Sequence, residues 1–150
     1  MPDTPLQRAL RDSVKEVLEK MFFVEPVEEQ FPTAESGSGA IAVGLAFDGS
    51  PSGSLCLCVG NDAARQIAAD FLGEGDDSLP VQKVQEVICE LANMICGSFL
   101  SHVETSTTFR LASPHLGAEP PADSRPVKER TAHAVQIAAG SLMVIVETRE

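Results

Sequence analysis

The chain has 150 residues with 22 acidic and 11 basic side chains, a formal net charge of -11. We expect a single domain over 1–150, long enough to bury a core without staples, and the charge disfavours nucleic acid and anionic membranes as partners. Without a run of about eighteen apolar residues or a basic, apolar leader, the sequence predicts a cytoplasmic protein that inserts no segment into a membrane.

The N-terminal half has the pattern of a helix followed by strands. In chain order, the expected elements are a helix over residues 5–23, an additional edge strand over 27–31, a flexible link over 35–39, and strands over 41–47 and 55–59. The apolar residues of the helix recur at helical spacing. The turn-rich residues 48–53 predict a β-hairpin between the last two strands.

The C-terminal half repeats this order after a short helix capped by Asn61 or Asp62, which continues to Leu72 and ends at Gly73. An acidic loop over 74–78 leads to a long helix with Pro80 in its first turn, where Asp77 or Ser78 supplies the cap. The segments expected after this helix are strands over 105–113, 133–138 and 142–146, with a hairpin turn at 139–141 and a long polar surface loop over 117–130.

The helix that follows Pro80 is apolar almost all round. At about 100° per residue, one narrow stripe of it carries Glu86, Glu90, Asn93 and Gly97. An ordinary surface helix has a broad charged side and a narrower apolar stripe, so this helix inverts the usual proportions. The stripe is either the thin solvent-facing side of a buried helix or a surface that meets a partner, whose backbone could approach closely at Gly97.

The pattern Glu90-x-x-Asn93, followed by Met94-x-x-Gly97, resembles the signature of the CheX/CheC/FliY chemotaxis phosphatases. That family has an Asp or Ser, then a Glu four residues later, an Asn three residues further on and a proline downstream. The matching residues here are Glu86, Glu90, Asn93 and Pro114, with Glu86 in place of the usual Asp or Ser. The resemblance implies an α/β fold in which two pseudo-symmetric helix-plus-strands halves share one sheet, with long helices packed on one face.

The first helix shows a weak internal match to this motif helix. The aligned pairs are Ser13 with Glu86, Val17 with Glu90, Lys20 with Asn93, and Met21 with Met94. Chance similarity between two amphipathic helices could produce so short a match, but strands follow each helix, which favours a duplication. Since Val17 and Lys20 cannot replace Glu and Asn, the resemblance implies one active site, as in CheX-like members, which tend to be homodimers. The apolar strand over 142–146 could provide an edge for such a dimer.

The resemblance also implies an activity, hydrolysis of the aspartyl phosphate on a CheY-like response regulator. This reaction needs a water held in line with the phosphorus, and it depends on positioning and electrostatics. The Asn93 carboxamide would orient that water and donate to a phosphoryl oxygen without adding negative charge. Glu90 would pair with a regulator lysine, and Glu86 and Gly97 would contact the partner. The Mg²⁺ belongs to the regulator, so no metal or cofactor of the chain's own is expected.

The four cysteines lack the spacing of a zinc or thioredoxin-like site. Cys56 and Cys58 should point to one face of a strand, and Cys89 and Cys96 should share one side of the motif helix. Because cysteine behaves as a small hydrophobe, we expect all four to pack in the core, reduced and without a ligand.

Two other classes of function remain open, a non-catalytic binding module and a small-ligand sensor. The same fold could serve as a non-catalytic adaptor for response regulators or as a flagellar-switch-type interaction module. The presence of both Glu90 and Asn93 favours the enzyme, because an adaptor needs only a complementary surface. A small-ligand sensor that uses the sheet face has less support, since no polar cluster is evident in the predicted strands.

Overall fold

The computed structural model describes residues 4–24, 26–28, 40–49, 52–73, 79–103, 109–117, 126–137 and 140–149. Its helices are α1 (Pro5–Met21), α2 (Asn61–Leu72) and α3 (Val81–Val103). Its strands are β1 (Val27–Glu28), β2 (Ala40–Asp48), β3 (Ser52–Gly60), β4 (Arg110–Leu111), β5 (His115–Leu116), β6 (Val127–Ile137) and β7 (Gly140–Arg149). The predicted link over 35–39, the loop over 74–78 with its caps, and part of the predicted strand over 105–113 lie outside the described residues.

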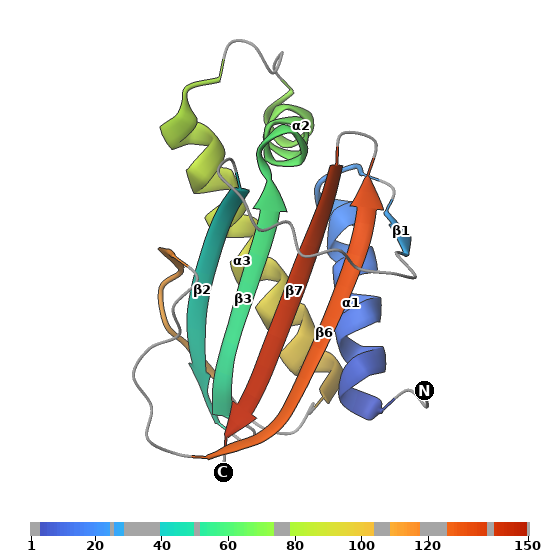
Figure 1. Ribbon diagram of the computed structural model, residues 1–150, viewed down its shortest axis with the longest axis vertical. Coiled ribbons are helices and arrows are strands. Elements are labelled where there is room, and N and C mark those ends of the chain that lie inside the picture. Colours follow the sequence, from blue (N-terminus) through green and yellow to red (C-terminus); the bar gives the residue numbers. More distant parts are fainter. Residues whose placement is uncertain are drawn as a thin grey trace.

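The described strands form one antiparallel sheet in the order β1-β6-β7-β3-β2-β4, and β5 also pairs with β2 (Figure 1). The hairpins β2–β3 and β6–β7 meet at the centre, where β3 pairs with β7. From the first half β1 borders β6, and from the second half β4 borders β2. Exchanging the halves therefore reproduces the strand order, which confirms the predicted pseudo-symmetric α/β fold.

The long helices α1 and α3 lie beside each other on one face of the sheet (Figure 1). α1, from the first half, packs on β6 of the second half, and α3, from the second half, packs on β2 of the first half. Each helix therefore covers a strand from the other half. Side chains that alternate along the strands fill the layer between sheet and helices, and among them Leu45, Leu57 and Val144 are fully buried. The core therefore lies on this face, and the strand residues between them point to the other face, which α1 and α3 do not cover and which is called the open face below.

The helix boundaries follow local hydrogen bonding. Thr4 caps α1, because its side-chain oxygen accepts from the backbone N–H of Gln7 at 3.0 Å. α2 starts after Gly60 without a side-chain cap, so the predicted capping by Asn61 or Asp62 is wrong. Gly73 ends α2 as predicted, at φ 69°, a conformation that favours glycine.

The helix α3 starts one residue after Pro80. The Pro80 carbonyl oxygen accepts from the N–H groups of Lys83 and Val84, so Pro80 is the N-cap residue whose carbonyl closes the first turn, as predicted to within one residue. None of the helices in the described ranges is long and apolar enough to cross a membrane.

The strands differ from prediction where they lack an apolar signal. β6 begins at Val127, inside the predicted surface loop over 117–130, because its polar first residues pair with the end of β7 across a register shift. In the predicted strand over 105–113, only Arg110 and Leu111 are extended among the described residues, as β4. The predicted hairpins themselves are confirmed, with Ile41 opposite Val59 in the first.

Candidate functional site

The polar stripe of α3 is exposed as its spacing predicts. Glu86 and Glu90 are exposed, and Asn93 and Gly97 are partly exposed. The residues of α3 that pack into the core are Val84, Val87, Ile88, Leu91, Ala92, Ile95, Cys96, Phe99 and Leu100. Leu100 is buried beside the Asn93 edge of this stripe, whereas Ser101, one turn after Gly97, is exposed. The predicted stripe from Glu86 to Gly97 spans about 16 Å.

The side chains of Glu90 and Asn93 form no hydrogen bond or ion pair within the described part of the chain. Glu86 differs, because its carboxylate lies 3.9 Å from the Lys83 ammonium group, with both side chains more than half exposed. Such an exposed pair contributes little to folding. Glu90 and Asn93, separated by one helical turn, therefore have donors and acceptors that this fold does not use.

Gly97 is an unusual residue for the interior of a helix, where glycine is less favourable than alanine by about 0.5–1 kcal/mol. A Cβ atom built at this position meets no atom within 4 Å. Packing among the described residues therefore does not require glycine at this position.

The surroundings of α3 leave the Asn93 side accessible. His102, nine residues after Asn93 and about 180° away around the helix, lies 3.5 Å from the Glu16 carboxylate of α1. Asn93 therefore faces away from α1. Pro114 stands directly before β5, the short edge strand that contacts α3, so the structure brings the downstream proline close to this helix in the fold.

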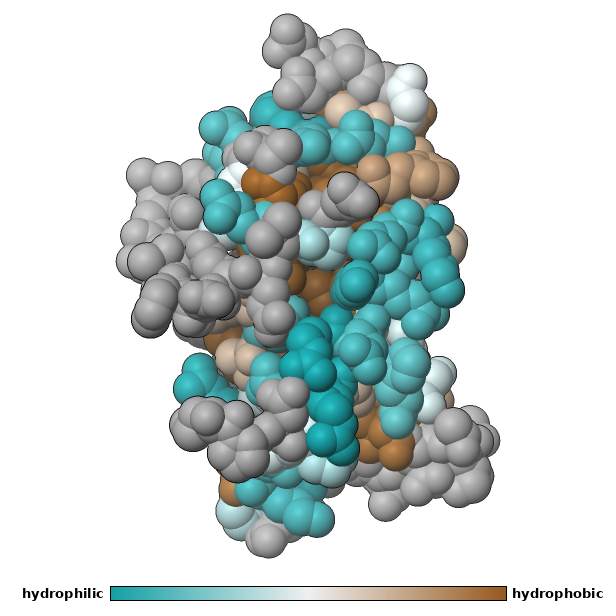
Figure 2. Space-filling model, turned by 90° about the vertical axis from the view of Figure 1, so that its right-hand side faces the viewer, coloured by the Kyte–Doolittle hydropathy of each residue, from teal (hydrophilic) through white to brown (hydrophobic). Residues whose placement is uncertain are grey.

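The alignment of α1 with α3 needs a correction of one residue. Ser13 and Val17 are buried, whereas their aligned residues Glu86 and Glu90 are exposed. A shift by one residue superposes most of the buried positions and pairs exposed Asp12 and Glu16 with exposed Glu86 and Glu90, and exposed Glu19 with partly exposed Asn93. The exposed side of α1 is hydrophilic along most of its length (Figure 2). In either alignment the first helix lacks a Glu-x-x-Asn pair, and a single active site in the second half stays a prediction.

The cysteines divide into two groups. Cys96 lies in the core, where burial raises its pKa to about 12, and Cys89 packs against the core with its pKa raised by burial and then by Glu86. Core packing is wrong for Cys56 and Cys58, which are partly exposed on the open face of β3. A hydrogen bond between these two thiols lowers the pKa of Cys58 to about 7 and raises that of Cys56.

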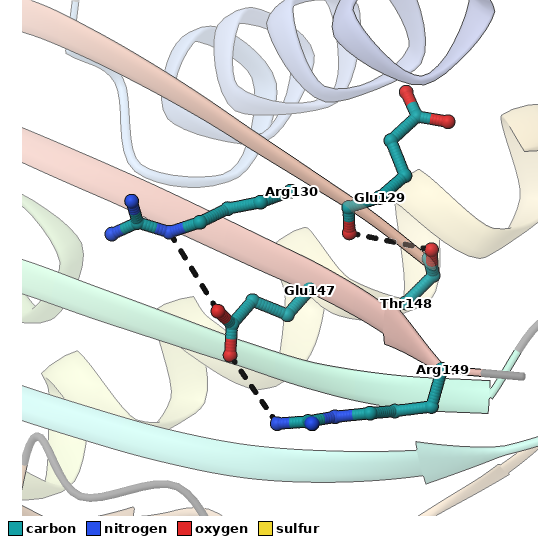
Figure 3. Close-up of polar contacts among 5 residues, drawn as sticks. All are labelled: Glu129, Arg130, Glu147, Thr148 and Arg149. Carbon is teal, nitrogen blue, oxygen red and sulfur yellow. Dashed lines mark hydrogen bonds and ion pairs between the residues drawn. The ribbon is translucent and has the colours of Figure 1, made fainter. Parts of the chain in front are cut away.

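The strands also hold a polar cluster that the sequence pattern did not indicate. The Glu147 carboxylate on β7 lies between two arginines, 3.7 Å from Arg130 on β6 and 3.5 Å from Arg149 (Figure 3). The Thr148 hydroxyl donates to the backbone oxygen of Glu129 at 3.4 Å. Arg130 was missed because it falls in the predicted loop, where no pairing partner was assigned. Across the described ranges, no three His, Cys, Asp or Glu side chains are grouped to hold a metal ion.

Comparison with known proteins places this fold among chemotaxis proteins. A CheX chemotaxis protein from Desulfovibrio desulfuricans matches with a TM-score of 0.74 and 18% identity over 97% of this chain and 100% of that one. A CheC-like superfamily protein from Shewanella matches with a TM-score of 0.77 and 17% identity over 99% of this chain and 100% of that chain. At these identities the likeness establishes the fold alone.

A third similar structure is the CheX-CheY-BeF3-Mg²⁺ complex from Borrelia burgdorferi, with a TM-score of 0.70 and 22% identity over 95% of this chain and 97% of that one. Comparison with curated protein sequences gave no match. The family model for the chemotaxis phosphatase CheX matches residues 41–138, a range that includes Glu90, Asn93 and Pro114. Since this range exceeds half of the 150 residues, the chain belongs to the CheX family.

Proposed function

We propose that this protein is a phosphatase that hydrolyses the aspartyl phosphate of a CheY-like response regulator. The observation that carries this proposal is the pair Glu90 and Asn93, one helical turn apart on the accessible stripe of α3 and unpaired within the described residues. Membership of the CheX family supports it, as does the association of a similarly folded CheX with CheY in the Borrelia burgdorferi complex.

In the proposed mechanism, Asn93 orients the attacking water. Its amide oxygen accepts a hydrogen bond from the water, and its amide nitrogen donates to a phosphoryl oxygen. A neutral side chain suits this position, because a carboxylate would repel the phosphoryl group. The water gains its position in line with the phosphorus from these bonds, and such positioning is the main protein contribution to phosphoryl transfer.

Glu90 is proposed to pair with a lysine of the regulator, which sets the register of α3 on its surface. Glu86 lies at the rim of the same stripe, and Gly97 allows the partner's backbone to come close. The Mg²⁺ in this proposal is held by the regulator, so the reaction requires no metal or cofactor bound to the present chain.

The proposal is tested by adding the protein to phosphorylated CheY-like regulators from the source organism and following the loss of phosphate. A catalytic amount should accelerate dephosphorylation of at least one regulator. Binding that leaves the rate of phosphate loss unchanged would instead support the non-catalytic adaptor or the flagellar-switch-type module, since these need only a complementary surface.

Replacing Gly97 with Ala should stabilise the isolated protein while weakening its complex with the regulator. Alanine favours the helix by about 0.5–1 kcal/mol, and the added methyl group meets no atom within 4 Å in the protein itself. Thermal unfolding should therefore occur at a higher temperature, and titration with the phosphorylated regulator should give a larger Kd. An unchanged Kd would contradict the close approach proposed at this position.

We further propose that the protein acts in the cytoplasm as a homodimer. The single Glu-x-x-Asn helix supports the dimer, because this is the CheX-like pattern. The strand over 142–146 does not, since it lies in β7, a central strand paired on both sides. Light scattering at micromolar concentration should give twice the chain mass of 15.9 kDa, and a monomer would contradict the proposal.

A further inference from the structure

The open face of the sheet carries two thiols at its centre. The Sγ atoms of Cys56 and Cys58 lie 3.9 Å apart on β3, and both side chains are partly exposed. The flanking residues on β2 are small, with Gly44 opposite Cys56 and Ala42 opposite Cys58. This pair lies on the side of the sheet away from α3, so it is separate from the proposed catalytic stripe.

The strand prevents these thiols from joining to each other. A disulfide needs its Cβ atoms about 3.5–4.5 Å apart, whereas side chains two residues apart on a strand leave from points about 6.5 Å apart. β3 cannot contract to close this difference, because it pairs with β2 and β7 along nearly its whole length. The two sulfur atoms therefore lie near each other but cannot form a disulfide bond.

A soft cation fits between the two sulfurs as they stand. Zinc–thiolate bonds are about 2.3 Å long, and two such bonds to sulfurs 3.9 Å apart subtend an angle of about 116° at the metal. This angle is close to that of tetrahedral coordination, which zinc adopts with thiolate ligands. A two-coordinate ion that requires a linear arrangement would need the sulfurs farther apart.

Against the expectation from the sequence that these thiols have no ligand, we propose that Cys56 and Cys58 bind one soft divalent cation of the zinc and cadmium class between their sulfur atoms. Two S–H bonds break, two sulfur–metal bonds form and two protons pass to solvent, with no change in oxidation state. The His115 ring lies over Gly44, but no described His, Cys, Asp or Glu completes a three-residue metal group with the thiols. The two thiolates are therefore the ligands that the described residues supply, and the ion has further coordination positions for water or other ligands.

Cadmium alone is the probe for this site, with purified, reduced, full-length protein. Titration should show one equivalent bound, with the near-ultraviolet absorption of cadmium–thiolate bonds rising to that point. Cys56→Ser and Cys58→Ser should each weaken binding more than about tenfold, because each leaves a single thiolate. Cys89→Ser is the matched control, since it removes a partly exposed thiol outside the pair and should leave binding unchanged.

Alkylation of the unsubstituted protein gives a second measurement that does not depend on the variants folding. One equivalent of cadmium should protect Cys56 and Cys58 together from an alkylating reagent, as read by peptide mass spectrometry, and leave Cys89 as reactive as before. Protection of Cys89 instead, or no bound cadmium at micromolar protein, would overturn the proposal.

Discussion

Replacing Asn93 with Ala should slow dephosphorylation of the regulator on the order of a hundredfold or more, as with loss of one positioned donor in other enzymes. The alanine variant cannot orient the water or donate to the phosphoryl oxygen. Its fold should persist, because Asn93 lies on the partly exposed stripe and forms no hydrogen bond within the described residues. Affinity for the regulator should change little, since Glu90 and the surrounding stripe remain.

Asn93→Asp tests the role of the amide group more specifically than Asn93→Ala, because the aspartate side chain has nearly the same shape as that of asparagine. Its carboxylate lacks the amide donor and places negative charge against the phosphoryl group, so its rate should be no better than that of Asn93→Ala. Stopped-flow decay of the phosphorylated regulator gives the rates, and thermal melts verify the fold of each variant. Unchanged decay rates in folded variants would end the phosphatase assignment and favour a solvent-facing stripe without a catalytic role.

The stripe on α3 could be predicted from the sequence because helical periodicity alone determines which residues share a side. Burial of Leu91 and Ile95 and exposure of Glu86 and Glu90 follow directly from that periodicity. The β2–β3 and β6–β7 hairpins were also predictable, since apolar runs and turn residues are local signals. The roles of Glu90 and Asn93 come from family resemblance and stay predictions.

The errors arose where tertiary contacts, and not local sequence patterns, determine the structure. Aligning α1 with α3 by residue identity placed buried Val17 on exposed Glu90, because two amphipathic helices match almost equally well in neighbouring registers. The start of β6 is exposed and polar, so only its pairing with β7 reveals a strand. Cys56 was correctly predicted to share one face of a strand with Cys58. Their placement in the core was wrong, because the packing of the whole chain determines which face the helices cover.

Replacing Glu90 with Ala should mainly weaken binding of the regulator. If the carboxylate pairs with a lysine that becomes desolvated in the complex, its loss costs roughly 2–5 kcal/mol of binding free energy. The isolated protein should keep its stability, since Glu90 is exposed and unpaired within the described residues. Titration of the phosphorylated regulator into each variant measures the change in Kd.

The matched control for this change is Glu86→Ala on the same stripe. Glu86 is also exposed but already lies 3.9 Å from Lys83, so its loss should change the binding free energy by less than about 1 kcal/mol. Raising the salt concentration should weaken the unsubstituted complex more than the Glu90→Ala complex, because a screened charge pair has been removed from the latter. If Glu90→Ala bound the regulator normally and failed only in turnover, Glu90 would belong to the chemical step and not to recognition of the partner.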